Sequence, residues 1–108
     1  MPITNWGRID WKNFSRKIEV DSASHLQTVM EKTFSEDDLS QPMFILWDEA
    51  SLPVVETNLN NALRVLDDVT AVSFDTWFFS PSIGYVIEFY HEGEITIGLI
   101  NSEKTENF

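Results

Sequence analysis

Apolar and polar residues alternate along the last third of the chain, and this alternation predicts three antiparallel strands over residues 70–79, 83–91 and 94–100. Alternate side chains of a strand point to the same face, so the apolar positions would share one face of a sheet. That expected core face comprises Val72, Phe74, Phe78, Ile83, Tyr85, Ile87, Phe89, Ile95, Ile97 and Leu99.

The same alternation predicts the two loops that join these strands. A four-residue loop over 79–82 would place Trp77 opposite Gly84 on the neighbouring strand. The second hairpin needs a three-residue loop over 91–93, with Gly93 at the position where a type I turn is followed by a residue of positive φ.

Helical spacing of apolar residues precedes these strands. One helix is expected to start at Asp21 or Ser22 and to end before 36–38, an acidic run predicted to be a solvated loop. Residues 43–47 (MFILW) have the composition of a buried strand, and 6–20 fit a short helix followed by a strand. The apolar face of the first helix would hold Ala23, Leu26, Val29, Met30 and Phe34. A second helix would open at Ser51 and Pro53 and bury Val55, Leu59, Ala62, Leu63 and Leu66.

The pattern therefore predicts an α+β fold: an antiparallel β-meander of three to five strands with two main helices packed on one face. A chain of 108 residues fits a single domain, 1–108, in which 102–108 fray. The absence of cysteine fits a reducing compartment, and no signal-peptide or membrane-spanning run is visible, so we expect a cytoplasmic protein.

Charge narrows the choice of partner. Eighteen acidic residues oppose seven basic ones, which gives a formal net charge of −11. Beyond residue 17 the imbalance is three bases against seventeen acids. Such a chain repels nucleic acid and anionic membranes, whereas it attracts a basic protein. Acidity that serves only solubility is the alternative.

The opposite face of the expected sheet supplies candidate binding residues. It combines carboxylates with large aromatic side chains and has no base, a composition suited to contact with a basic, partly apolar surface. The expected contacts are Asp75, Trp77, Glu88, Tyr90 and Glu94. The alternative is that another element, such as the N-terminal segment, covers Trp77 and Tyr90.

Two further acidic pairs are candidates for partner contact. Asp48 and Glu49 directly follow the strand expected at 43–47, and strand ends are rigid supports. Asp67 and Asp68 would lie at the C-terminal end of the second helix, where negative charge opposes the helix dipole; a turn into the next strand is the alternative explanation.

The residues that catalysis requires are missing from the pattern. His25 and His91, the only histidines, have no metal-ligand spacing, and each is expected at the surface. The four glycines form no phosphate-binding motif. We therefore expect no enzyme activity, no metal and no cofactor.

The segment WDEASLPVVETNLNNALRVLDDVTAVSFDTWFFSPSIGYVIEFYHEGEITIG, with the size and charge of the chain, resembles immunity proteins of bacterial toxin systems. These include the CdiI-type proteins of contact-dependent growth inhibition and the nuclease-colicin immunity proteins. The resemblance implies a tight one-to-one complex with a basic toxin nuclease domain, which blocks the active site or substrate channel of the toxin. We expect the chain alone to be a monomer. Barstar is an inhibitor of the same kind, but the expected meander departs from its parallel sheet. A type III-like secretion chaperone and an inhibitor that mimics nucleic acid remain alternatives.

Overall fold

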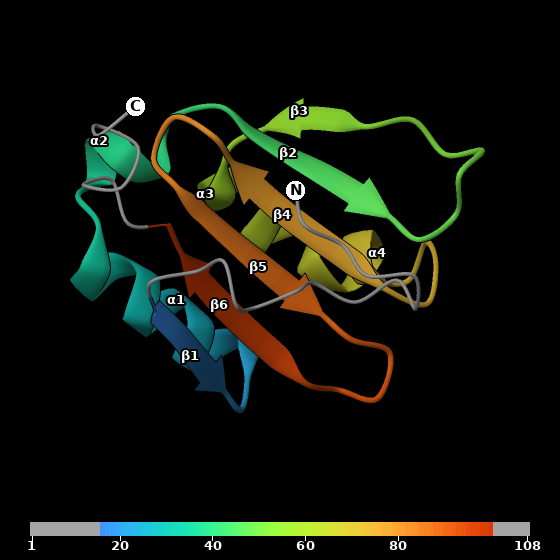
Figure 1. Cartoon of the computed structure of the whole chain (residues 1–108), viewed down its shortest axis with the longest axis horizontal. Helices are drawn as coiled ribbons and strands as arrows, with labels where there is room; N and C mark the ends of the chain where they lie inside the picture. The colour runs from blue at the N-terminus through green and yellow to red at the C-terminus, as the bar shows by residue number, and fades with distance from the viewer. Residues whose placement is uncertain (1–15, 101–108) are drawn as a thin grey trace.

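The structure, a computed structural model, describes residues 16–100 and shows a sheet with helices packed against it (Figure 1). All neighbouring strands are antiparallel, in the order β1-β6-β5-β4-β2-β3. The predicted α+β class is confirmed, although the six strands exceed the predicted three to five. The elements are β1 (Arg16–Val20), α1 (Ala23–Thr33), α2 (Glu36–Leu39), β2 (Met43–Trp47), β3 (Val55–Thr57), α3 (Leu59–Arg64), α4 (Leu66–Thr70), β4 (Thr76–Ser80), β5 (Tyr85–Phe89) and β6 (Ile95–Leu99). The predicted strand before residue 21 is therefore present, whereas the short helix expected before it and the tail at 102–108 lie outside the described residues.

The hairpin between β5 and β6 has the predicted three-residue loop. The Tyr90 N–H donates to the Glu94 carbonyl at 2.9 Å, and the Gly93 N–H donates to the Tyr90 carbonyl at 2.9 Å. Gly93 has φ +98°, a conformation that side chains with a Cβ rarely adopt. The glycine therefore fixes this loop.

The hairpin between β4 and β5 also has a four-residue loop, but the predicted position was wrong. Ser80 pairs with Tyr85, so the loop spans 81–84 instead of 79–82, and Trp77 pairs with Glu88 instead of Gly84. The Gly84 N–H donates to the Ser80 carbonyl at 2.8 Å, and Gly84 closes the turn with φ +93°. Because the register moved by an even number of residues, each strand kept its predicted face.

The first predicted helix is confirmed, while the acidic run after it is a helix and not the expected loop. Ser22 caps α1: its side chain accepts a hydrogen bond from the His25 N–H at 3.1 Å. Ser35 and Asp38 form a capping box around α2, which satisfies two backbone N–H groups reciprocally. Acidic residues in the first turn of a helix also interact favourably with its dipole, so 36–38 begin a helical turn.

The predicted second helix is wrong in its boundaries. Its first part is the edge strand β3, which pairs with β2, and helical structure starts only after Asn58. The Asn58 side chain accepts a hydrogen bond from the Asn61 N–H at 2.9 Å and so caps α3. The chain leaves the helical conformation at Val65, with φ −123° and ψ 28°, and α4 follows.

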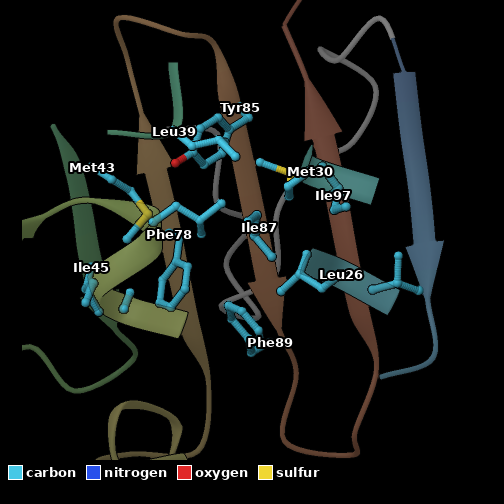
Figure 2. Packing of buried hydrophobic residues seen from close by; sticks show 13 residues of the cluster. Leu26, Met30, Leu39, Met43, Ile45, Phe78, Tyr85, Ile87, Phe89 and Ile97 are labelled. Atoms are coloured by element: carbon cyan, nitrogen blue, oxygen red, sulfur yellow. The ribbon is translucent and has the colours of Figure 1, made fainter. Parts of the chain in front are cut away.

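The helices cover one face of the sheet and form the main core (Figure 2). Leu26 and Met30 of α1 and Leu59 of α3 are fully buried against the predicted apolar positions of the strands. Burial also raises the pKa of the Tyr85 phenol, because the low-dielectric core disfavours its charged form. Two positions assigned to this face were wrong: Val72 and Phe74 precede β4 and are exposed.

The other face of the sheet is buried as well, which contradicts the expectation that it is open to solvent. Trp77 is 2% exposed and Glu88 is fully buried. Leu46, Phe79 and Val86 pack with Trp77 in a second apolar cluster. Apolar side chains on both faces of a central strand favour burial of both. The idea that the N-terminal segment covers this face concerns residues outside the described range.

Candidate functional site

Trp77 and Glu88 form a pair inside the molecule. The Trp77 Nε1–H donates a hydrogen bond to Glu88 Oε2 at 3.1 Å across β4 and β5. Both side chains are buried, and a buried carboxyl group requires such donors because burial removes its water. The geometry therefore makes these two predicted contact residues part of the packing of the second face.

Asp75 is also buried, at 6% exposure, and it joins three segments at one end of the sheet. Its Oδ1 accepts a hydrogen bond from the His91 backbone N–H at 2.8 Å and lies 2.9 Å from the His91 imidazole Nδ1. The Asp75 N–H in turn donates to Asp48 Oδ1 at 3.1 Å. Asp75 thus holds the end of β2, the start of β4 and the β5–β6 loop together.

An exposed aromatic residue stands beside this junction. The Phe74 side chain is 78% exposed, and its ring meets the His91 ring edge-on, with centroids 6.0 Å apart. Tyr90 stacks at a tilt on the same imidazole at 4.2 Å. A large apolar side chain that is exposed next to a hydrogen-bonded junction is a suitable anchor for a protein partner.

Three open hollows adjoin one another along α4, next to this aromatic group. Their volumes are about 420, 230 and 360 Å³. The first two share Leu66 and Asp67, and the last two share Thr70 and Tyr90. We call these three adjoining hollows together the acidic groove; its walls include Asp67, Asp68, Phe74, Tyr90, His91 and Glu94.

Negative charge gathers at this end of the sheet, where β2 and β5 end and β4 and β6 begin (Figure 1). Lys32, by contrast, lies in the last turn of α1, toward the opposite end, where Phe34 contacts Tyr85. Among the residues described, Arg64 is the one base that lines the groove, and its guanidinium contacts the Asn61 side chain. The acidic residues at this end are Asp21, Asp48, Glu49, Asp67, Asp68, Asp75, Glu92 and Glu94.

The predicted contact residues therefore divide into two groups. Asp48, Asp67, Asp68, Tyr90 and Glu94 lie at the groove or beside it, together with Glu49, whose side chain accepts a hydrogen bond from the Ser51 hydroxyl at 3.1 Å. Trp77 and Glu88 lie inside the fold, and Asp75 is hydrogen-bonded to His91, which lines the groove.

Two assignments near the groove need correction. Asp67 and Asp68 lie in the first turn of α4, not at a helix C-terminus, so they interact favourably with its dipole. Phe74 was missed as a surface anchor because its apolar character fitted the alternation of a strand that begins only at Thr76. His91 is exposed as expected, and its imidazole also has a partner, Asp75.

Neither a metal centre nor a membrane-spanning segment is found in the part of the chain that the structure describes. Residues 16–100 contain no group of three or more His, Asp or Glu side chains arranged to hold an ion. Their helices are too short and too polar to cross a bilayer.

The chain was compared with known protein families. The family described as CdiI immunity protein EcoliA0-like matches residues 1–98, which is most of the chain. No curated protein matches this sequence.

Proposed function

The chain belongs to the CdiI immunity protein family, and we propose that it neutralises a cognate toxin nuclease of basic charge in the cytoplasm. Family membership supports the neutralisation of a cognate toxin, because proteins of this family neutralise toxins. The nuclease activity of the target, its basic charge and the one-to-one stoichiometry are the finer parts of the proposal.

The charge of the chain supports a basic target. A net charge of −11 on 108 residues creates a negative field that accelerates association with a positive protein. Nucleases bind their substrate through basic surfaces that neutralise phosphates. An acidic inhibitor bound over such a surface excludes the nucleic acid by charge as well as by volume.

No step of this inhibition requires chemistry from the chain itself. The immunity protein would act by occupying the toxin surface, either at its active site or along its substrate channel. Its contribution is a rigid, acidic, partly aromatic surface, and the hydrogen-bonded junction at Asp75 is one such rigid support.

Protection in cells tests the coarser proposal. A candidate toxin domain, sought in the gene next to that of this chain, would be expressed with and without the chain, and growth would be followed. We expect the chain to restore growth and to co-purify with the toxin domain as a one-to-one complex by light scattering. Growth arrest that persists despite normal levels of the chain would refute neutralisation.

Association kinetics test the finer proposal. The association rate constant should fall steeply between about 0.01 M and 0.15 M salt, because the screening length shrinks from roughly 30 Å to 8 Å. A rate that is unchanged over this range would refute electrostatic steering by a basic target. In vitro cleavage of DNA and RNA by the toxin domain, with and without the chain, identifies the inhibited activity.

A further inference from the structure

We propose that the acidic groove along α4, with Phe74 at its margin, is the surface that contacts the toxin. The inference rests on the proposed function and adds the location of the interface and the chemistry of its occupant. The occupant is a basic segment of the toxin that presents Lys or Arg side chains next to an apolar one.

The shape of the surface is the first argument. The three hollows adjoin one another through shared lining residues, and two of them reach the β5–β6 loop at Gly93. Leu66 and Phe89 supply an apolar floor, while Asp67 and Glu94 are exposed at its sides. Interfaces commonly combine an apolar centre with a polar rim in this way.

Phe74 is the second argument. Among the large hydrophobic residues that are exposed within 16–100, it has the greatest exposure, 78%. The backbone next to Phe74 is fixed because Asp75 is hydrogen-bonded to two segments, and the Phe74 ring contacts the His91 ring. An exposed aromatic held in place loses little conformational freedom on binding, so it suits the role of an anchor.

Charge complementarity indicates that the groove binds a basic segment of a protein. The acids at this end of the sheet face a partner that must carry positive charge if the toxin binds nucleic acid. Lys and Arg also have long apolar stems that pack on an apolar floor while their charged heads reach the carboxylates at the rim.

The first test compares two double variants with the same change of charge. Asp67→Asn/Asp68→Asn removes two carboxylates from the first turn of α4, at the groove. Glu36→Gln/Asp37→Asn removes two from the first turn of α2, at the opposite end of β2. Both variants change the net charge by the same amount and remove carboxylates from the first turn of a short helix, but at opposite ends of the sheet.

The expected difference lies in the dissociation rate of the toxin complex. The variant at α4 should raise Kd by about tenfold or more at 0.15 M salt, mainly through faster dissociation. The variant at α2 should alter Kd by less than about threefold, mainly through slower association. Equal effects of the two variants would overturn the placement of the interface.

The second test concerns the anchor. Phe74→Ala should raise Kd by roughly 30-fold or more, the loss expected when an anchoring aromatic side chain is truncated. Val54→Ala, at a residue 58% exposed before β3, is the matched control and should leave Kd unchanged. Both variants should melt with the wild type, because both side chains are largely exposed.

The outcomes separate this inference from the function on which it rests. If the wild-type chain protects cells and both groove variants bind the toxin normally, the interface lies elsewhere and the proposed function stands. If the wild-type chain neither binds nor protects, the proposed function fails, and the inference fails with it.

Discussion

The Trp77–Glu88 hydrogen bond provides a direct test of how the second face of the sheet is held. Trp77→Phe keeps an aromatic ring but removes the Nε1–H that donates to Glu88 Oε2 at 3.1 Å. Both residues are buried, so water cannot replace the lost donor. A buried polar group that loses a partner costs about 1–3 kcal/mol, and the smaller ring adds a packing loss.

A double-mutant cycle isolates the hydrogen bond from the packing loss. Glu88→Met replaces the carboxyl group by an apolar side chain of similar length, and Trp77→Phe is then made in both backgrounds. The packing loss is common to both backgrounds, whereas the loss of the hydrogen bond occurs only where Glu88 is present. We expect Trp77→Phe to cost about 1–3 kcal/mol less in the Glu88→Met background.

Urea unfolding followed by far-UV circular dichroism measures these differences without relying on the fluorescence of the altered tryptophan. In a domain of this size, 1 kcal/mol corresponds to roughly 4–8 °C in melting temperature, so thermal unfolding gives an independent check. Trp47→Phe is the matched control: Trp47 Nε1–H donates to the Val69 carbonyl at 2.9 Å, but its side chain is only half-buried, so we expect a smaller cost than for Trp77→Phe. Equal costs of Trp77→Phe in the two Glu88 backgrounds would refute the coupling.

Two further predictions concern single positions. Gly93→Ala should destabilise the fold by roughly 1–2 kcal/mol, because Gly93 has φ +98°, a conformation strained for alanine. A Cβ at this position would meet no atom within 4 Å, so the cost would come from the backbone conformation and not from a clash. An unchanged urea midpoint would contradict this prediction. Burial raises the pKa of Tyr85 above its ordinary 10.0, so the folded state holds the phenol proton more tightly than the unfolded state does. Stability should therefore fall as pH rises above about 10, and Tyr85→Phe should show a smaller fall between pH 9 and 11 in urea unfolding. The same pH slope in both proteins would exclude this effect.

Local chemistry made several elements predictable from the sequence. The strand β2 was predicted at its observed bounds because a short apolar run next to Pro42 fits few structures other than a buried strand. The loop at Gly93 was predicted because the strand faces permit only a three-residue connection there, and such a loop requires a residue of positive φ. Both the apolar run and the loop geometry depend on neighbouring residues only, so they can be recognised from the sequence alone.

The wrong predictions arose where one sequence pattern fits more than one structure. An even register shift preserves every side-chain face, so alternation alone does not distinguish a loop at 79–82 from one at 81–84. Helical spacing from Val55 to Leu66 was coincidental, since Val55 lies in a strand and Val65 interrupts the helix. The cap at Asn58 was the local signal that marked the true start of α3.

The acidic and aromatic character of the candidate site was predicted from the sequence, but its position on the fold was predicted only in part. Most of the acidic candidates lie near one another because strand ends and short loops meet at one end of the sheet. Trp77 and Glu88 do not join them, because amphipathic alternation does not reveal whether the second face of a sheet is covered. Phe74 was missed because the start of β4 was predicted too early.

Burial of both faces has a consequence for how this fold can bind. The centre of the sheet offers no side chains to a partner, since Trp77, Val86 and Glu88 are buried on one face and helices cover the other. Contacts must then come from the ends or edges of the sheet, where loops carry exposed side chains. A loop held in one conformation loses less entropy on binding, and Asp75 ties the loop after β5 to the end of β2. If the groove is the interface, as proposed, the buried Asp75 carboxyl group would support binding indirectly, because its hydrogen bond to the His91 N–H holds the loop that lines the groove.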